Sequence, residues 1–137
     1  MKGLGQQGFT MLEVLITVTI LGILATFAVP RFANATTLAN TAKVASDLQT
    51  LDAAIAIYEM ENGKPPGELS DLADYINDAE SLKPPKGKCN LKNGGELAIT
   101  SETAYTIAPK KASDKSSASY CRAYCGEYTA ADFGRKE

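Results

Sequence analysis

Residues 8 to 30 read Gly-Phe-Thr-Met-Leu-Glu-Val-Leu-Ile-Thr-Val-Thr-Ile-Leu-Gly-Ile-Leu-Ala-Thr-Phe-Ala-Val-Pro, and this stretch decides the fold of the chain. The run from Phe9 to Val29 carries a single charged side chain, Glu13, near its start. As a helix the run would be about 31 Å long, at about 1.5 Å per residue. The hydrocarbon core of a bilayer is about 30 Å thick, so the sequence predicts a helix that spans a membrane.

Glu13 is expected to have a partner, because a charge deep in hydrocarbon costs at least ~2.5–3.5 kcal/mol. It lies four residues after Phe9, which is about 6 Å along a helix. If the chain were cut between Gly8 and Phe9, the free amine of Phe9 in one subunit would pair with Glu13 of another. Two unit charges 4 Å apart attract by about 4 kcal/mol at an effective dielectric constant of ~20. This pairing predicts an assembly device that sets the register of helices in lipid, where apolar packing alone discriminates poorly.

The segment Gly8-Phe9-Thr10-Met11-Leu12-Glu13-Val14-Leu15 resembles the processing signature of type IV pilins and pseudopilins. Pro30 stands where the family usually has a proline, and Gly22 where it often has a glycine. The resemblance covers about residues 1 to 66. It implies that a prepilin peptidase cuts after Gly8 and methylates the amine of Phe9. It also implies a homo-oligomeric filament of packed N-terminal helices, assembled by an inner-membrane platform and an ATPase.

The sequence predicts four consecutive segments. They are a leader peptide (1–8), a transmembrane and filament-core helix (9–30), the amphipathic half of the same helix (31–62) and a globular head (63–137). Lys2 in the leader favours a cytoplasmic N-terminus. We therefore expect a single-pass protein of the cytoplasmic (inner) membrane with its head outside the cytoplasm. After assembly it would belong to an extracellular or periplasmic filament.

The amphipathic half of the helix carries an apolar stripe with spacings of four, three, four and three residues. Its members are Val44, Leu48, Leu51, Ile55 and Tyr58, whereas Lys43, Asp47, Asp52 and Glu59 lie largely off it. Asn62-Gly63 followed by Pro65-Pro66 predicts the end of the helix.

Gly22 and Pro30 bracket the weakest stretch of the helix, because glycine costs about 1 kcal/mol relative to alanine and proline about 3. A kink is expected at Pro30. In related filaments this segment tends to unwind, and the resemblance implies the same flexibility here.

The head is expected to contain a short helix and a small sheet. Ser70 would cap a helix that reaches Ile76, with Leu69, Leu72 and Ile76 facing the core. Asn93-Gly94-Gly95 predicts the turn of a hairpin between strands at 89–91 and 96–100. Thr103–Ile107 would add a third strand, and Tyr120–Tyr128 a fourth strand or an irregular segment. The predicted class is α+β, with an antiparallel sheet of three or four strands on the long helix.

The three cysteines, Cys89, Cys121 and Cys125, are disulfide candidates outside the cytoplasm. A bond from Cys89 to Cys121 or to Cys125 is favoured, and a local Cys121–Cys125 bond remains open. Zinc is disfavoured because the chain has no histidine. Some secretion pseudopilins carry a calcium-binding loop near the C-terminus. Here the corresponding tail, residues 126–134, has only two carboxylates and no tryptophan, so no metal or other cofactor is expected.

Catalysis has little support in this sequence. Histidine, the commonest general base, is absent, and neither G-x-x-x-x-G-K-[ST] nor G-x-G-x-x-G occurs. The net charge of −2 gives no electrostatic argument for a nucleic-acid partner. We therefore expect a structural subunit and not an enzyme.

Three functions remain open. The first is a subunit of a type IV pilus for adhesion, motility or DNA uptake. The compact head and the lack of a calcium-like tail favour this function slightly. The alternative is a type II secretion pseudopilin that drives protein export. The third is a secreted, disulfide-bearing binding module with an ordinary signal peptide cut near Ala35, since Ala33-Asn34-Ala35 is an A-x-A site.

Overall fold

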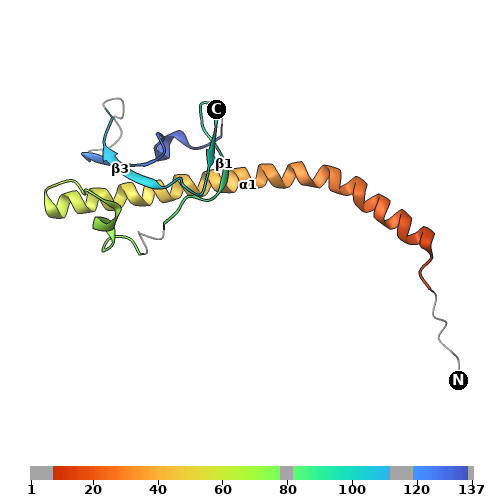
Figure 1. Ribbon diagram of the computed structural model, residues 1–137. Helices are drawn as coiled ribbons and strands as arrows, with labels where there is room; N and C mark the ends of the chain where they lie inside the picture. Colours follow the sequence, from red (N-terminus) through yellow and green to blue (C-terminus); the bar gives the residue numbers. More distant parts are fainter. Residues whose placement is uncertain (1–7, 78–81, 112–118, 136–137) are drawn as a thin grey trace, which may run out of the picture. The chain divides into compact units, whose positions relative to one another are not determined.

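The computed structural model describes residues 8–77, 82–111 and 119–135 (Figure 1). The predicted leader, apart from Gly8, therefore lies outside the described residues. Contacts between residues divide the chain into two units, of which the first ends at Ala35 and the second begins at Thr36.

Helix α1 runs from Met11 to Asn62 and confirms the prediction of one long N-terminal helix. It begins two residues later than expected and ends where the sequence predicted, because Gly63 adopts a left-handed conformation with φ of 66°. Gly22 and Pro30 both lie within helical backbone in this single chain. Their unwinding in a filament, and the kink at Pro30, stay predictions.

Every residue from 8 to 35 in the first unit is exposed. Large apolar side chains account for much of this surface, including Met11 at 92% exposure and Phe27 at 72%. The helix is long and apolar enough to cross a membrane. Because water solvates such a surface poorly, this unit needs lipid or neighbouring helices around it.

The second half of α1 supplies one side of the core of the second unit. Val44, Leu48, Leu51 and Ile55 are fully buried, and Tyr58 packs partly buried at the end of the same stripe. The predicted amphipathic stripe is thus confirmed. Burying such a side chain contributes about 1.5–3 kcal/mol relative to leaving it in water. This apolar stripe is the main attachment of the head to the helix.

In the part of the chain that the structure describes, four short strands cover this stripe, and Figure 1 shows β1 and β3 beside the second half of α1. They are β1 (Gly87–Asn90), β2 (Glu96–Ile99), β3 (Tyr105–Pro109) and β4 (Cys121–Cys125). Strands β1 and β2 form the predicted hairpin, in which Cys89 faces Leu97 and Gly94 makes the turn with φ of 86°. Strands β3 and β4 are also antiparallel, with Ile107 opposite Ala123.

Over the described residues the strands form two separate two-stranded sheets, and not the single sheet of three or four strands that the sequence predicted. The free edge at the end of β1 is taken by the C-terminal segment instead of β3. Leu91 bridges to Phe133, Lys92 N–H donates to the Asp132 carbonyl at 2.9 Å, and Gly134 N–H donates to the Asn90 carbonyl at 3.2 Å. The α+β class is confirmed.

The short helix of the head also differs from its prediction. A 3₁₀ turn, η1, covers Leu69–Leu72, and Glu68 precedes it in the capping position expected of Ser70. The carboxylate of Asp71 holds this start, because it accepts the backbone N–H groups of Gly67 at 2.8 Å and Glu68 at 3.1 Å. Leu72 and Ile76 are buried as predicted. A second 3₁₀ turn, η3, covers Ala130–Asp132.

The expected disulfide is not formed, and Cys89, Cys121 and Cys125 are free thiols in the structure. Cys89 lies on β1 and the other two on β4, so a long-range bond would join the two sheets, and Cys89 and Cys125 lie near each other in the core. All three are buried, and each packs as a small apolar residue within the core.

Gly87 is the glycine that the docking of β1 depends on most. Its φ is 125°, and a Cβ built there would lie 2.9 Å from Nδ2 of Asn40. We predict that Gly87→Ala lowers the free energy of unfolding by about 2–3 kcal/mol, through backbone strain and the displaced amide. Urea denaturation followed by circular dichroism measures this loss.

The matched control is Gly63→Ala, where φ is 66° but no atom lies within 4 Å of the added Cβ. It should cost only the strain of the left-handed conformation, about 1–2 kcal/mol. Equal losses for the two variants would contradict the steric role of Gly87.

Candidate functional site

The residues that the sequence predicts to act in N-terminal processing and assembly lie at the start of α1. Gly8 and Phe9 are exposed and precede the helix, so the bond between them is in accessible, non-helical backbone. Thr10 makes the first hydrogen bonds of the helix: its carbonyl accepts the N–H groups of Glu13 at 3.1 Å and Val14 at 3.2 Å. Its hydroxyl Oγ1 also accepts the Glu13 N–H at 3.2 Å. Thr10 therefore caps the helix.

Glu13 lies in the first turn of α1, one turn inside the cap. The backbone N–H groups of this turn point towards the helix start and carry partial positive charge, which favours a carboxylate there. The side chain is exposed in the single chain. The spacing of Thr10 and Glu13 is that of a capping box, a local sequence signal for the start of the helix that was not used in the prediction.

Thr10→Val should fray the first turn of α1, because valine keeps the shape of threonine but removes the accepting hydroxyl. The loss of an N-cap costs about 0.5–2 kcal/mol. We expect the amides of Glu13 and Val14, whose N–H groups bond to Thr10, to exchange hydrogen several-fold faster in detergent micelles, measured by mass spectrometry. Thr10→Ser keeps the hydroxyl and serves as the control, and unchanged exchange in the valine variant would refute the capping role.

The remaining polar side chains between Phe9 and Val29 are satisfied within the helix. The hydroxyls of Thr17, Thr19 and Thr26 donate to the carbonyls of Glu13, Leu15 and Gly22 at 2.8, 2.7 and 3.0 Å. A Cβ at Gly22 would meet no atom within 4 Å, so packing within the chain does not require a glycine there. The surface offered to lipid or to another helix is therefore apolar, with a gap at Gly22.

A second group of polar residues fastens the head to α1, beginning where the core begins. The Nδ2 of Asn40 donates to the carbonyl of Lys86 at 3.2 Å, and the hydroxyl of Thr41 accepts the N–H of Asn90 at 2.8 Å. Both side chains are buried. Neither contact was predicted from the sequence, although the two residues extend the apolar stripe by one turn before Val44.

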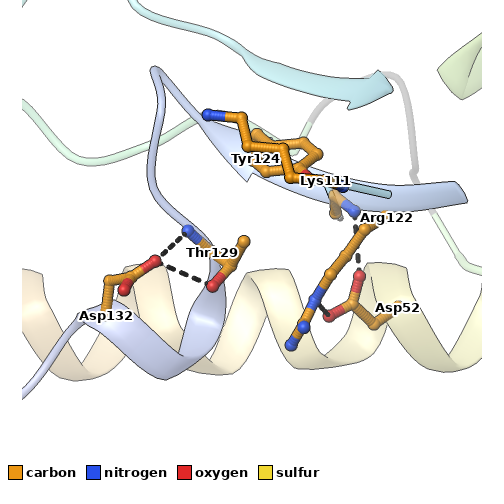
Figure 2. A network of polar contacts seen from close by, with 7 residues as sticks. Asp52, Lys111, Arg122, Tyr124, Thr129 and Asp132 are labelled. Carbon is orange, nitrogen blue, oxygen red and sulfur yellow. Dashed lines mark hydrogen bonds and ion pairs between the residues drawn. The ribbon is translucent and has the colours of Figure 1, made fainter. Parts of the chain in front are cut away.

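Three carboxylates of α1 bind the second sheet. Asp47 accepts the hydroxyl of Tyr105 at 2.7 Å. Asp52 accepts the N–H of Ala123 at 2.9 Å and Nε of Arg122 at 3.1 Å, and Figure 2 shows the Arg122 side chain reaching this carboxylate. Farther along, Glu59 accepts the N–H groups of Tyr120 and Cys121 at 3.1 and 3.0 Å. These three acidic residues lie beside the apolar stripe. Their carboxylates hydrogen-bond to the head and are not simply solvated charges.

This arrangement closes the outer edge of β4. Strand β3 pairs with one side of β4, and the N–H groups of Cys121 and Ala123 point the other way, to Glu59 and Asp52. The next such group, Cys125 N–H, donates to the carbonyl of Tyr128 at 2.9 Å. Carboxylates and a turn thus replace a further strand, which keeps this edge from pairing with another chain.

Buried titratable groups of the core favour their neutral forms. Burial raises the pKa of Cys125 to about 11, and the nearby Cys89 thiol adds to the effect. Burial also raises the pKa of the Tyr105 hydroxyl, and its hydrogen bond to Asp47 raises it further. Folding therefore keeps these protons bound at a pH where the unfolded chain releases them.

Alkaline pH should destabilise the head for this reason. The folded pKa of Cys125 lies above its usual value of 9.0, so its contribution is complete below pH 9 and is lost as the pH rises towards 11. The loss is about 1.4 kcal/mol for each pH unit in this range. Urea denaturation at pH 8 to 11 measures it, and the Cys125→Ala variant should show a smaller slope. An equal slope in wild type and variant would contradict the assignment to Cys125.

The N-terminal segment is similar to a known protein family. A family model described as the prokaryotic N-terminal methylation motif matches residues 4–29. These residues include the candidate cleavage site at Gly8 and Phe9, as well as Glu13.

Curated relatives extend the similarity beyond this motif. The type II secretion system core protein G of Vibrio cholerae is 41% identical over 92 residues, which make up 67% of this chain and 60% of the relative. The core protein G of Klebsiella pneumoniae is 39% identical over 79 residues, or 58% of this chain and 56% of that protein. That of Aeromonas hydrophila is 32% identical over 92 residues, covering 67% and 62%. The chain thus spans less than two thirds of the length of these relatives. No solved structure matches it at the same level of significance.

Proposed function

Because the chain belongs to the type IV pilin and pseudopilin family, we propose that it is a structural subunit of a type II secretion filament. In this function a short filament grows in the periplasm and drives protein export. The observation that carries the proposal is the similarity to core protein G over 79 to 92 residues, well beyond the methylation motif at 4–29. This favours secretion over the surface pilus that the sequence alone suggested.

The proposed maturation uses the residues at the start of α1. A prepilin peptidase would cut the accessible bond between Gly8 and Phe9 and methylate the new amine. The apolar first unit would hold the subunit in the cytoplasmic membrane, with the head in the periplasm. Glu13 would then pair with the Phe9 amine of a neighbouring subunit during extraction into the filament, since both groups lie within about one helical turn.

The exposed apolar surface of the first unit supports the same proposal. It is suited first to lipid and then to the packed helices of a filament core, where the gap at Gly22 lets another helix approach closely. The polar contacts of Asn40, Asp52 and Glu59 would keep the head attached to α1 while the helix is drawn from the membrane. Energy for extraction would come from a cytoplasmic ATPase that acts through the assembly platform.

Deletion of the gene in its own host tests the function. We expect exported enzymes to accumulate in the periplasm while surface pili, counted by electron microscopy, remain unchanged. Complementation with the wild-type gene should restore export. Normal export together with loss of surface filaments would instead assign the chain to a pilus.

The state of the mature N-terminus tests the processing step. Mass spectrometry of the membrane-bound protein should find a chain that begins with methylated Phe9. A chain that begins after Ala35 and is soluble would support the secreted binding module and contradict both filament functions.

A further inference from the structure

The C-terminal turn of the head lines a cleft of about 370 Å³ beside strand β4. Charged and hydroxyl-bearing residues from two distant parts of the chain meet there, as Figure 2 shows for four of them. The polar residues of the lining are Lys111, Tyr124, Glu127, Tyr128, Thr129 and Asp132. Two of these side chains, Glu127 and Asp132, are carboxylates in a loop-rich region, and some pseudopilins bind calcium in a loop near the C-terminus.

The carboxylate of Asp132 is already engaged by the turn itself. Its Oδ2 accepts the backbone N–H and the hydroxyl of Thr129, both at 2.8 Å. The N–H of Asp132 returns to the carbonyl of Thr129 at 3.0 Å, so the two residues bind each other reciprocally. The turn is further tied to the hairpin, because the Asp132 carbonyl accepts the N–H of Lys92 at 2.9 Å.

A cation is also present in the cleft. The ammonium of Lys111 lies 5.5 Å from the centre of the Tyr124 ring and donates to the carbonyl of Glu127 at 3.5 Å. The backbone N–H of Lys111 donates to the hydroxyl of Tyr124 at 3.4 Å, which keeps the two residues together. A lysine above an aromatic face is held by the negative potential of the ring.

These residues do not fit calcium. The ion takes six to eight oxygen ligands at about 2.3–2.6 Å, from carboxylates, carbonyl groups and water. Over residues 8–77, 82–111 and 119–135, no group of three or more histidine, cysteine, aspartate or glutamate side chains is placed to hold a metal. The ammonium of Lys111 would in addition repel a divalent ion from the cleft.

We propose that Lys111 is the resident cation of the C-terminal turn, and that the head keeps its fold without calcium. Lys111 joins the segment after β3 to Glu127 and Tyr124, while Thr129 and Asp132 close the turn by hydrogen bonds. The proposal concerns the stability of the head and holds whichever machine the filament serves. Its failure is therefore separate from failure of the proposed export function.

The test compares thermal unfolding of the full chain in detergent micelles, in millimolar calcium chloride and in EDTA. We expect the two Tm values to agree within about 1 °C, whereas a bound ion at 100 times its Kd would raise Tm by several degrees. Lys111→Met should lower Tm by about 2–6 °C in both solutions, because it removes the charge and keeps the stem. Lys111→Arg, the matched control, keeps a cation above the ring and should stay near the wild-type Tm.

Two outcomes would overturn the proposal. A calcium-dependent rise in the Tm of the wild-type chain would show that the head binds the ion. A Lys111→Met variant that unfolds at the wild-type Tm would show that the lysine has no role in the turn. Near-ultraviolet circular dichroism of the tyrosines reports the unfolding of the head and is insensitive to the apolar helix.

Discussion

Filaments are expected to disappear when Glu13 is replaced by valine in the only copy of the gene. The substitution removes the single charge in the apolar segment, and with it the proposed pair between Glu13 and the Phe9 amine of a neighbour. One such pair at 4 Å is worth about 4 kcal/mol at an effective dielectric constant of ~20. That difference corresponds to about a thousand-fold in the association constant at each subunit contact. Crosslinking of subunits in intact cells, followed by immunoblotting, measures the loss.

The head must stay folded for this result to count as an assembly defect. Glu13 lies in the first unit and the head in the second, so the Tm of the purified variant should match that of the wild type. Glu13→Asp keeps a carboxylate on a shorter stem and should retain part of the assembly. Thr17→Val, four residues along the same face, keeps Glu13 intact and should assemble normally. Full assembly by Glu13→Val would refute the role of the carboxylate in register.

The helix was predictable because its signals are local. The apolar stripe from Val44 to Ile55 repeats at the helical period, and Asn62-Gly63 supplies the left-handed residue that ends the helix. The hairpin was predictable for the same reason, since Asn93-Gly94-Gly95 specifies a tight turn between two short apolar segments. Each of these signals is read over a few residues and needs no knowledge of distant parts of the chain.

The polar contacts of the head were not predictable in this way. In the sequence alone, Asp52 and Glu59 resemble solvated charges on a helix. In the fold they accept the two N–H groups of β4 that do not bond to β3. The division into two sheets has a similar origin, because the C-terminal segment at Phe133 occupies an edge that β3 was expected to take. Both features depend on which distant segment packs against the edge of a strand. The periodicity of apolar residues carries no information about such long-range contacts.

The predicted cap of the short head helix, Ser70, was wrong for a different reason. Ser70 is a favourable capping residue, but Asp71 competes for the same role with a carboxylate that reaches two backbone N–H groups. Its bonds to Gly67 and Glu68 move the start of the turn to Leu69. The pKa of Asp71 lies below its usual value, first because of the bond from Glu68 and then that from Gly67.

The largest loss of stability in the head is expected from Asp52→Ala. The carboxylate joins the N–H of Ala123 at 2.9 Å and the guanidinium of Arg122 at 3.1 Å, and these side chains of Asp52 and Arg122 are only 23% and 9% exposed. Removing one partner of a largely buried pair costs about 3–5 kcal/mol, because the remaining charge loses the group that offset its desolvation. The outer edge of β4 would lose a hydrogen bond at the same time. Urea denaturation of the full chain in micelles gives the change in the free energy of unfolding.

Asp52→Asn separates the two contributions of this carboxylate. The amide oxygen of asparagine still accepts the N–H of Ala123, so the edge of β4 stays closed while the charge opposite Arg122 is lost. We expect a smaller loss, about half that of the alanine variant, since a charged hydrogen bond is roughly twice as strong as a neutral one. Lys43→Met is the control for an exposed pair, because Lys43 contacts Asp47 with its side chain 52% exposed. It should change stability by less than about 0.5 kcal/mol. If Asp52→Ala were as mild as Lys43→Met, the helix carboxylates would not hold the sheet, and the apolar stripe alone would attach the head to α1.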